Sequence, residues 1–99
     1  MKIQQENKIL TVYLTGEIDH HSAKDLREAA DGALLRGRPK ELILDFSGVT
    51  FMDSSGVGLV MGRYKSARAL GCAVTVRGLS PRDRKIMRMS GLTSLITFI

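Results

Sequence analysis

The sequence has no tryptophan, and its 99 residues include only five aromatic side chains and one cysteine. Any core must therefore be aliphatic, and Cys72 has no partner for an internal disulfide. No apolar run approaches the roughly 18 residues that a membrane-spanning helix needs, and residues 1–6 lack the apolar stretch of a signal peptide. We therefore expect a single cytoplasmic domain over residues 1–99, with no membrane partner.

Charge is spread unevenly along the chain, whose formal net charge is +5. Residues 1–62 carry seven Lys/Arg against nine Asp/Glu, whereas residues 63–99 carry eight against one, Asp83. Such a basic segment can mark an anionic partner, but most residues of this kind are simply solvated helix surface. No aromatic stacking platform accompanies the charge, so we predict no direct contact with nucleic acid.

Hydrophobic periodicity predicts the strands. Side chains suited to a core occupy every second position over residues 10–14 and 72–77, which indicates strands with one buried face. Residues 42–46 are almost continuously apolar, as expected for a central strand. A short first strand around Ile3 and a last strand over residues 95–99 complete the set.

Three helices are predicted between these strands. The first begins at Ser22, which forms a possible capping box with Asp25, and ends near Gly37. The second spans residues 57–70, with Val57, Val60, Met61, Tyr64 and Ala67 offered to the core. The third begins after Ser80 as N-cap and ends before Gly91, with Ile86, Met87 and Met89 able to pack inward.

The order β-β-α-β-α-β-α-β predicts an α/β fold. Alternating strands and helices favour a mixed, mostly parallel sheet with right-handed crossovers, and one-sided strands place the helices mainly on one face. Two predicted loops, residues 16–21 and 47–55, then meet at the carboxyl edge of the sheet, where ligand and partner sites gather.

The most distinctive motif is Asp53-Ser54-Ser55-Gly56, between the central strand and the second helix. A serine at a helix start lies beside free backbone N–H groups, which suits a phosphorylatable or ligand-contacting hydroxyl. The alternative is that Ser54 or Ser55 only caps the helix.

Other chemistry finds little support in the sequence. A nucleophile elbow needs Gly-x-Ser-x-Gly with a later histidine, but His20 and His21 both precede the serines. Adjacent histidines do not suit one metal ion as i, i+4 histidines do. The glycines after Ser55 lack the Lys-Ser/Thr ending of a phosphate loop. We therefore predict no catalytic residue, metal or cofactor.

Several segments together resemble the STAS domain of bacterial anti-sigma factor antagonists, in particular those of sporulation. The resemblance covers nearly the whole chain and rests on residues 14–21, 42–46, 51–58, 62–65 and 89–92. It implies the STAS fold and a regulatory protein that is not an enzyme. The unphosphorylated antagonist would bind an anti-sigma factor that is also a serine kinase of the GHKL type, releasing the sigma factor. Phosphorylation would inactivate it, and a PP2C-like phosphatase would restore it.

The same resemblance implies roles for individual residues. Ser54, the first serine of the motif, matches the phosphoacceptor position. Asp19 and Asp53 match interface positions, and we add His20, Ser55 and Gly56 to the expected partner-binding set as their neighbours.

One feature departs from the family, and two alternatives stay open. Family members usually carry a further helix after the last strand, whereas this chain ends at Ile99, so apolar surface near Ile96 and Phe98 is expected to be exposed. The first alternative is a general stress-signalling or transporter-attached STAS domain. The second, from a different class, is a nucleotide-binding protein with weak hydrolase activity.

Overall fold

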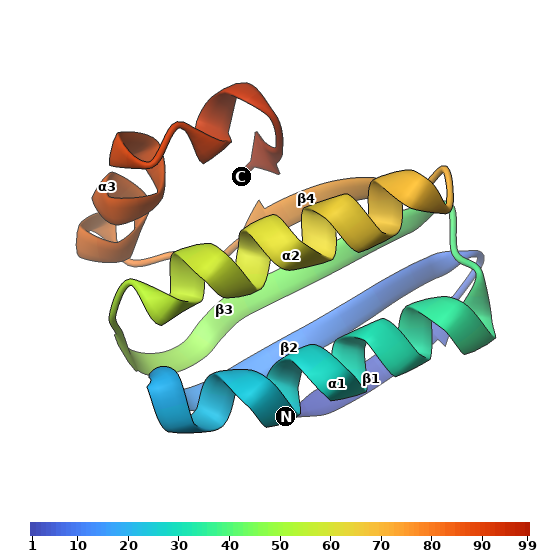
Figure 1. Cartoon of the computed structure of the whole chain (residues 1–99), viewed down its shortest axis with the longest axis horizontal. Coiled ribbons are helices and arrows are strands. Elements are labelled where there is room, and N and C mark those ends of the chain that lie inside the picture. Colours follow the sequence, from blue (N-terminus) through green and yellow to red (C-terminus); the bar gives the residue numbers. More distant parts are fainter.

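A five-stranded sheet with its strands in sequence order organises residues 1–99 in this computed structural model (Figure 1). Its strands are β1 (Lys2–Glu6), β2 (Ile9–Ile18), β3 (Glu41–Met52), β4 (Ala73–Arg77) and β5 (Thr97–Phe98). The helices are α1 (His20–Gly37), α2 (Ser55–Ala69) and α3 (Pro81–Met89), followed by a 3₁₀ turn, η1 (Leu92–Ser94). The predicted order of elements is thus confirmed.

The pairing of the strands matches the predicted mixed, mostly parallel sheet. β1 runs antiparallel to β2, while β2, β3, β4 and β5 pair in parallel. Figure 1 shows α1 and α2 side by side on one face of the sheet, with α3 beyond the carboxyl end of β4. None of the α-helices combines the length and the apolar character needed to cross a membrane.

The core lies between the sheet and the pair α1 and α2. Alternate strand residues supply one half of it, because successive side chains of a strand point to opposite faces. On α1, Leu26, Ala30, Ala33 and Leu34 face this core and are buried, and Ala29 beside them is half-buried. The hydrophobic core includes Leu10, Val12, Leu14, Leu26, Ala30, Leu34, Leu42, Leu44, Leu59, Val60, Val74 and Val76.

The inward face of α2 differs from the predicted one. Leu59 and Arg63 are buried, whereas Val57, Met61 and Tyr64 are only partly covered.

Arg63 is buried because it pairs with α1. Its Nε and Nη2 donate to the two carboxylate oxygens of Asp31 at 2.7 and 3.2 Å, and its Nη1 donates to the Leu59 carbonyl. Arg63 therefore joins the two helices and is not part of a solvated basic surface.

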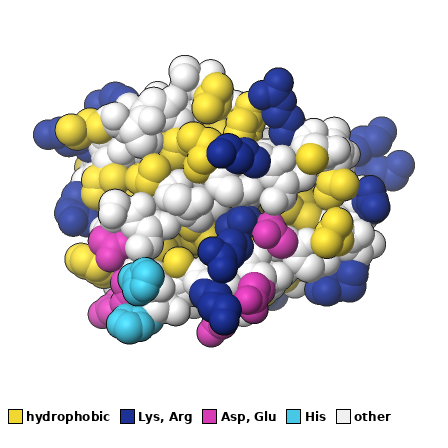
Figure 2. Space-filling model, in the orientation of Figure 1, with side chains coloured by type: hydrophobic (Ala, Val, Ile, Leu, Met, Phe, Trp, Pro, Cys, Tyr) yellow, Lys and Arg dark blue, Asp and Glu magenta, His cyan; other side chains and the backbone are white.

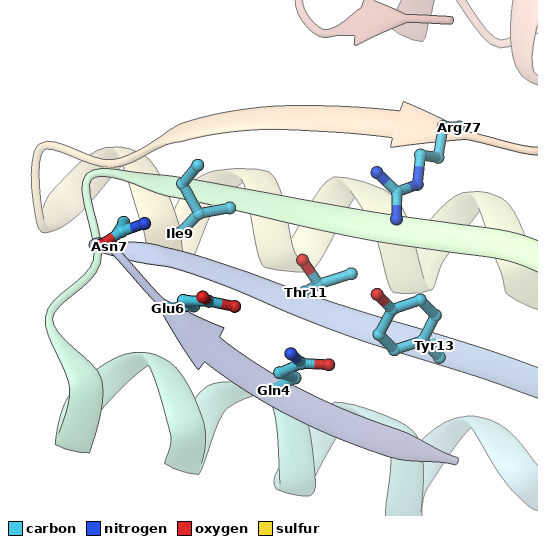
Figure 3. A pocket seen from close by; sticks show the side chains of 7 residues that line it. All are labelled: Gln4, Glu6, Asn7, Ile9, Thr11, Tyr13 and Arg77. Carbon is cyan, nitrogen blue, oxygen red and sulfur yellow. The ribbon is translucent and has the colours of Figure 1, made fainter.

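The opposite face of the sheet is polar, which explains the one-sided alternation of its strands. Arg77 Nε donates to Asp45 Oδ2 at 2.7 Å, and the guanidinium lies 5.9 Å from the ring centre of Tyr13. Burial alone would raise the pKa of Asp45, but hydrogen bonds from Arg77 and Ser47 lower it overall. A hollow on this face is lined by Gln4, Glu6, Asn7, Ile9, Thr11, Tyr13 and Arg77 (Figure 3).

Most residues of the two predicted loops in fact belong to strands or helices. β2 continues to Ile18 and β3 to Met52, because their parallel pairing persists through register shifts around Thr15 and Gly16. The connections are therefore short: Asp19 alone joins β2 to α1, and Asp53 and Ser54 join β3 to α2. The polar residues of both segments favour loops, but the pairing of β2 with β3 outweighs that local preference.

The C-terminal region also differs in detail. Ser80 caps α3 as predicted, since its hydroxyl accepts the N–H of Asp83 at 3.1 Å. Met89, predicted to pack inward, is 78% exposed, because α3 ends there. The last strand shortens to two residues, and Ile96 is buried beside η1 whereas Leu95 and Ile99 are exposed.

Candidate functional site

Two helix starts meet at the carboxyl edge of the sheet. Ile18 and Met52 are the last paired residues of β2 and β3, so Asp19 and Asp53 follow directly on neighbouring strands. The backbone N–H of Asp53 donates to the carbonyl of Ile18 at 3.2 Å and ties the two connections together. The predicted meeting of these segments at one edge is thus confirmed.

Asp19 is the N-cap of α1. Its Oδ1 accepts the backbone N–H groups of His21 and Ser22, both at 2.9 Å, and its own N–H donates to the Ser22 hydroxyl at 3.0 Å. The hydrogen bond from the Ser22 backbone is the main cause of a lowered pKa at Asp19, so the carboxylate stays charged. The predicted capping box of Ser22 with Asp25 is wrong: Ser22 is the third helical residue, and Asp19 caps.

The first turn of α2 is capped by an acid too. Asp53 Oδ1 accepts the backbone N–H of Ser55 at 2.8 Å. Ser54 occupies the N-cap position with helical backbone angles, φ −63° and ψ −16°, and its side chain makes no capping bond. Asp53 thereby replaces the serine cap, and the exposed Ser54 hydroxyl has no partner within the chain.

The remaining predicted site residues differ in accessibility. His20 is exposed at the start of α1, where its ring lies edge-on to His21 at 5.9 Å, and Ser55 is half-buried. Gly56 is buried, and a Cβ there would collide with the side chain of Met52. Packing thus accounts for Gly56, while partner contact by these three residues stays a prediction.

Gly56→Ala is expected to destabilise the domain by about 1–3 kcal/mol, the usual cost of overpacking a core. Met52 is completely buried, so its side chain would have to shift within the core. Gly58→Ala is the matched control, because no atom lies within 4 Å of a Cβ there. Alanine at that helical position should stabilise by up to about 1 kcal/mol. Urea unfolding of both variants measures the difference, and equal changes would contradict the packing argument.

Sequence reasoning missed a contact between α3 and this edge. Arg82 Nη1 donates to the Met52 carbonyl at 3.1 Å, and the guanidinium lies 5.7 Å from the ring centre of Phe51. Figure 1 shows the start of α3 close to the start of α2. No local pattern indicates this contact, because it joins residues 30 positions apart in the sequence.

The whole chain, residues 1–99, matches the STAS domain. The chain belongs to the STAS domain family. The anti-sigma F factor antagonist of Lysinibacillus sphaericus is 37% identical over 83 residues, covering 84% of this chain and 71% of that protein. The anti-sigma F factor antagonist of Paenibacillus polymyxa is 32% identical over 96 residues, covering 97% and 82%.

A solved structure agrees with this assignment. The Bacillus cell fate determinant SpoIIAA in its phosphorylated form superposes on this STAS domain with a TM-score of 0.77 and 31% identity. The match covers 99% of this chain and 89% of that one. The resemblance read from the sequence segments and the STAS fold are both confirmed.

Proposed function

We propose that this STAS domain is an anti-sigma factor antagonist controlled by phosphorylation of Ser54. In the unphosphorylated state it binds an anti-sigma factor that is a serine kinase of the GHKL type, and a sporulation sigma factor is released. Phosphorylation of Ser54 by that kinase ends the binding. A PP2C-like serine phosphatase returns the protein to its active state.

The free hydroxyl of Ser54 is the observation that carries this proposal. Asp53 takes over the capping of α2, so the serine oxygen is exposed and bonded to nothing in the chain. A kinase can therefore reach it without unfolding the helix. Two relatives are anti-sigma F factor antagonists, and the similar SpoIIAA exists in a phosphorylated form.

Two carboxylates, those of Asp19 and Asp53, make the edge of the sheet that carries Ser54 negatively charged. Asp19 and Asp53 each use one oxygen as a helix cap, which fixes the carboxylates at the edge of the sheet. A cationic group on the partner would complement them, and such pairing steers association.

Incubation with the cognate anti-sigma factor and ATP, followed by intact mass and peptide mapping, tests the proposal. One added phosphate on the peptide containing Ser54 is the expected result. The absence of any phosphate, together with ATP turnover by the isolated domain, would instead favour a nucleotide-hydrolysing protein.

Asp19→Asn is expected to weaken binding of the anti-sigma factor by roughly 3- to 10-fold, because a charge at the contact surface is lost. Asparagine caps helices as well as aspartate, so the change in stability should stay within about 0.5 kcal/mol. Calorimetric titration and thermal unfolding measure the two quantities. Asp25→Asn removes an exposed charge farther along α1 and serves as the control. Equal affinities of both variants and the wild type would remove Asp19 from the interface.

A further inference from the structure

Arg82 of α3 and Phe51 of β3 contact each other at the carboxyl edge of the sheet, where Ser54 also lies. Phe51 is 45% exposed, which is unusual for a phenylalanine directly beside a buried strand end. The guanidinium of Arg82 lies over its ring at 5.7 Å, and the Arg82 side chain is itself 64% exposed. The pair therefore presents an aromatic ring, three residues before Ser54, beside a cation supplied by α3.

The contacts of Arg82 hold it in place but leave most of its hydrogen-bonding capacity unused. Only Nη1 bonds within the chain, donating to the Met52 carbonyl at 3.1 Å and to Asp83 Oδ1 at 3.2 Å. Asp83 is buried, and its carboxylate accepts this hydrogen bond from Arg82. The backbone N–H of Asp83 donates to the Ser80 hydroxyl. Nε and Nη2 of Arg82 remain free, so the fork can still bind a carboxylate of another molecule.

Charge divides the surface around Ser54 into two halves. In Figure 2, Lys and Arg side chains lie over α3, and acidic side chains lie beside the histidines at the start of α1. On the α1 side lie the carboxylates of Asp19 and Asp53. On the α3 side lies a helix with four cations, Arg82, Arg84, Lys85 and Arg88, and a single acid, Asp83, that is buried. A partner that covers both halves must carry an anionic group opposite α3.

We propose that Phe51 and Arg82 form a recognition pair that binds an acidic segment of the anti-sigma factor next to the Ser54 contact. This inference rests on the proposed function and extends its interface from β3 and α1 onto α3. The ring supplies apolar contact area, and the free nitrogens of Arg82 receive the carboxylate. Aromatic residues and arginine are the types most enriched among residues that dominate binding energy. The pair also assigns a binding role to Arg82, one of the eight basic residues between positions 63 and 99.

Calorimetric titration of the unphosphorylated domain with the cognate anti-sigma factor, at low and high salt, tests the pair. Arg82→Gln should weaken binding about 10-fold and make the affinity less dependent on salt, since one ion pair is lost. Arg82→Lys keeps the charge but not the planar fork, so an intermediate loss with wild-type salt dependence is expected. Phe51→Leu should weaken binding without changing the salt dependence.

Arg88→Gln is the matched control, because it removes an exposed arginine from the last turn of the same helix. An equal loss for Arg88→Gln and Arg82→Gln would overturn the pair in favour of the general charge of α3. Unchanged or tighter binding by Arg82→Gln would overturn the inference while leaving the proposed function intact. A wild-type domain that does not bind the anti-sigma factor at all would overturn the proposed function itself. Amide spectra of residues 51–55 check that the variants keep the strand end in place.

Discussion

Ser54→Ala is expected to abolish phosphorylation and to leave a domain that binds the anti-sigma factor permanently. The Ser54 hydroxyl makes no hydrogen bond within the chain, so its removal costs the fold little. The change in unfolding free energy should stay within about 0.5 kcal/mol, as for other exposed positions. Intact mass after kinase treatment measures the first effect, and calorimetric titration in the presence of ATP measures the second.

Ser55→Ala is the control for this result. Its backbone N–H, and not its side chain, donates to Asp53, so the start of α2 survives the substitution. Ser55→Ala should still accept one phosphate, on Ser54. Phosphate on Ser55 at the wild-type rate in the Ser54→Ala domain would show that the second serine is the acceptor.

Much of the fold could be predicted because the strands have one buried face. The alternation of Leu10, Val12 and Leu14 follows directly from burial on one side, and the same is true of residues 72–77. Predictions failed where tertiary pairing outweighed local pattern. The polar ends of β2 and β3 look like loops in the sequence, yet each strand supplies the hydrogen-bonding partner that the other needs.

The candidate site could be predicted in outline but not in its contacts. Parallel topology alone brings Asp19 and Asp53 to one edge, because both follow the carboxyl ends of adjacent strands. Which residue caps α2 could not be predicted, since aspartate and serine are both good caps. The roles of Arg63 and Arg82 depend on partners 32 and 30 residues away, which no local period encodes.

Phosphorylation of Ser54 is expected to weaken binding at least about 100-fold through charge at the contact surface, because an unpaired buried charge typically costs 2–5 kcal/mol or more. Within the isolated domain the opposing effects are small. The start of α2 favours an anion by about 0.3–1 kcal/mol, and a carboxylate such as Asp53 repels it by about 1 kcal/mol at 4 Å in water. These contributions nearly cancel, so the domain has little reason to rearrange.

The complex responds differently, because its interface would have to bury a dianion beside the carboxylates of Asp19 and Asp53. Such burial is severely unfavourable without a paired cation. Ser54→Asp should reproduce the loss only in part, since it adds one charge on a shorter side chain. Amide chemical shifts of the two phosphoforms separate a local switch from a change of fold. Shifts confined to residues 16–21 and 47–60 are expected, and large changes elsewhere would mean that the phosphate acts through the whole domain.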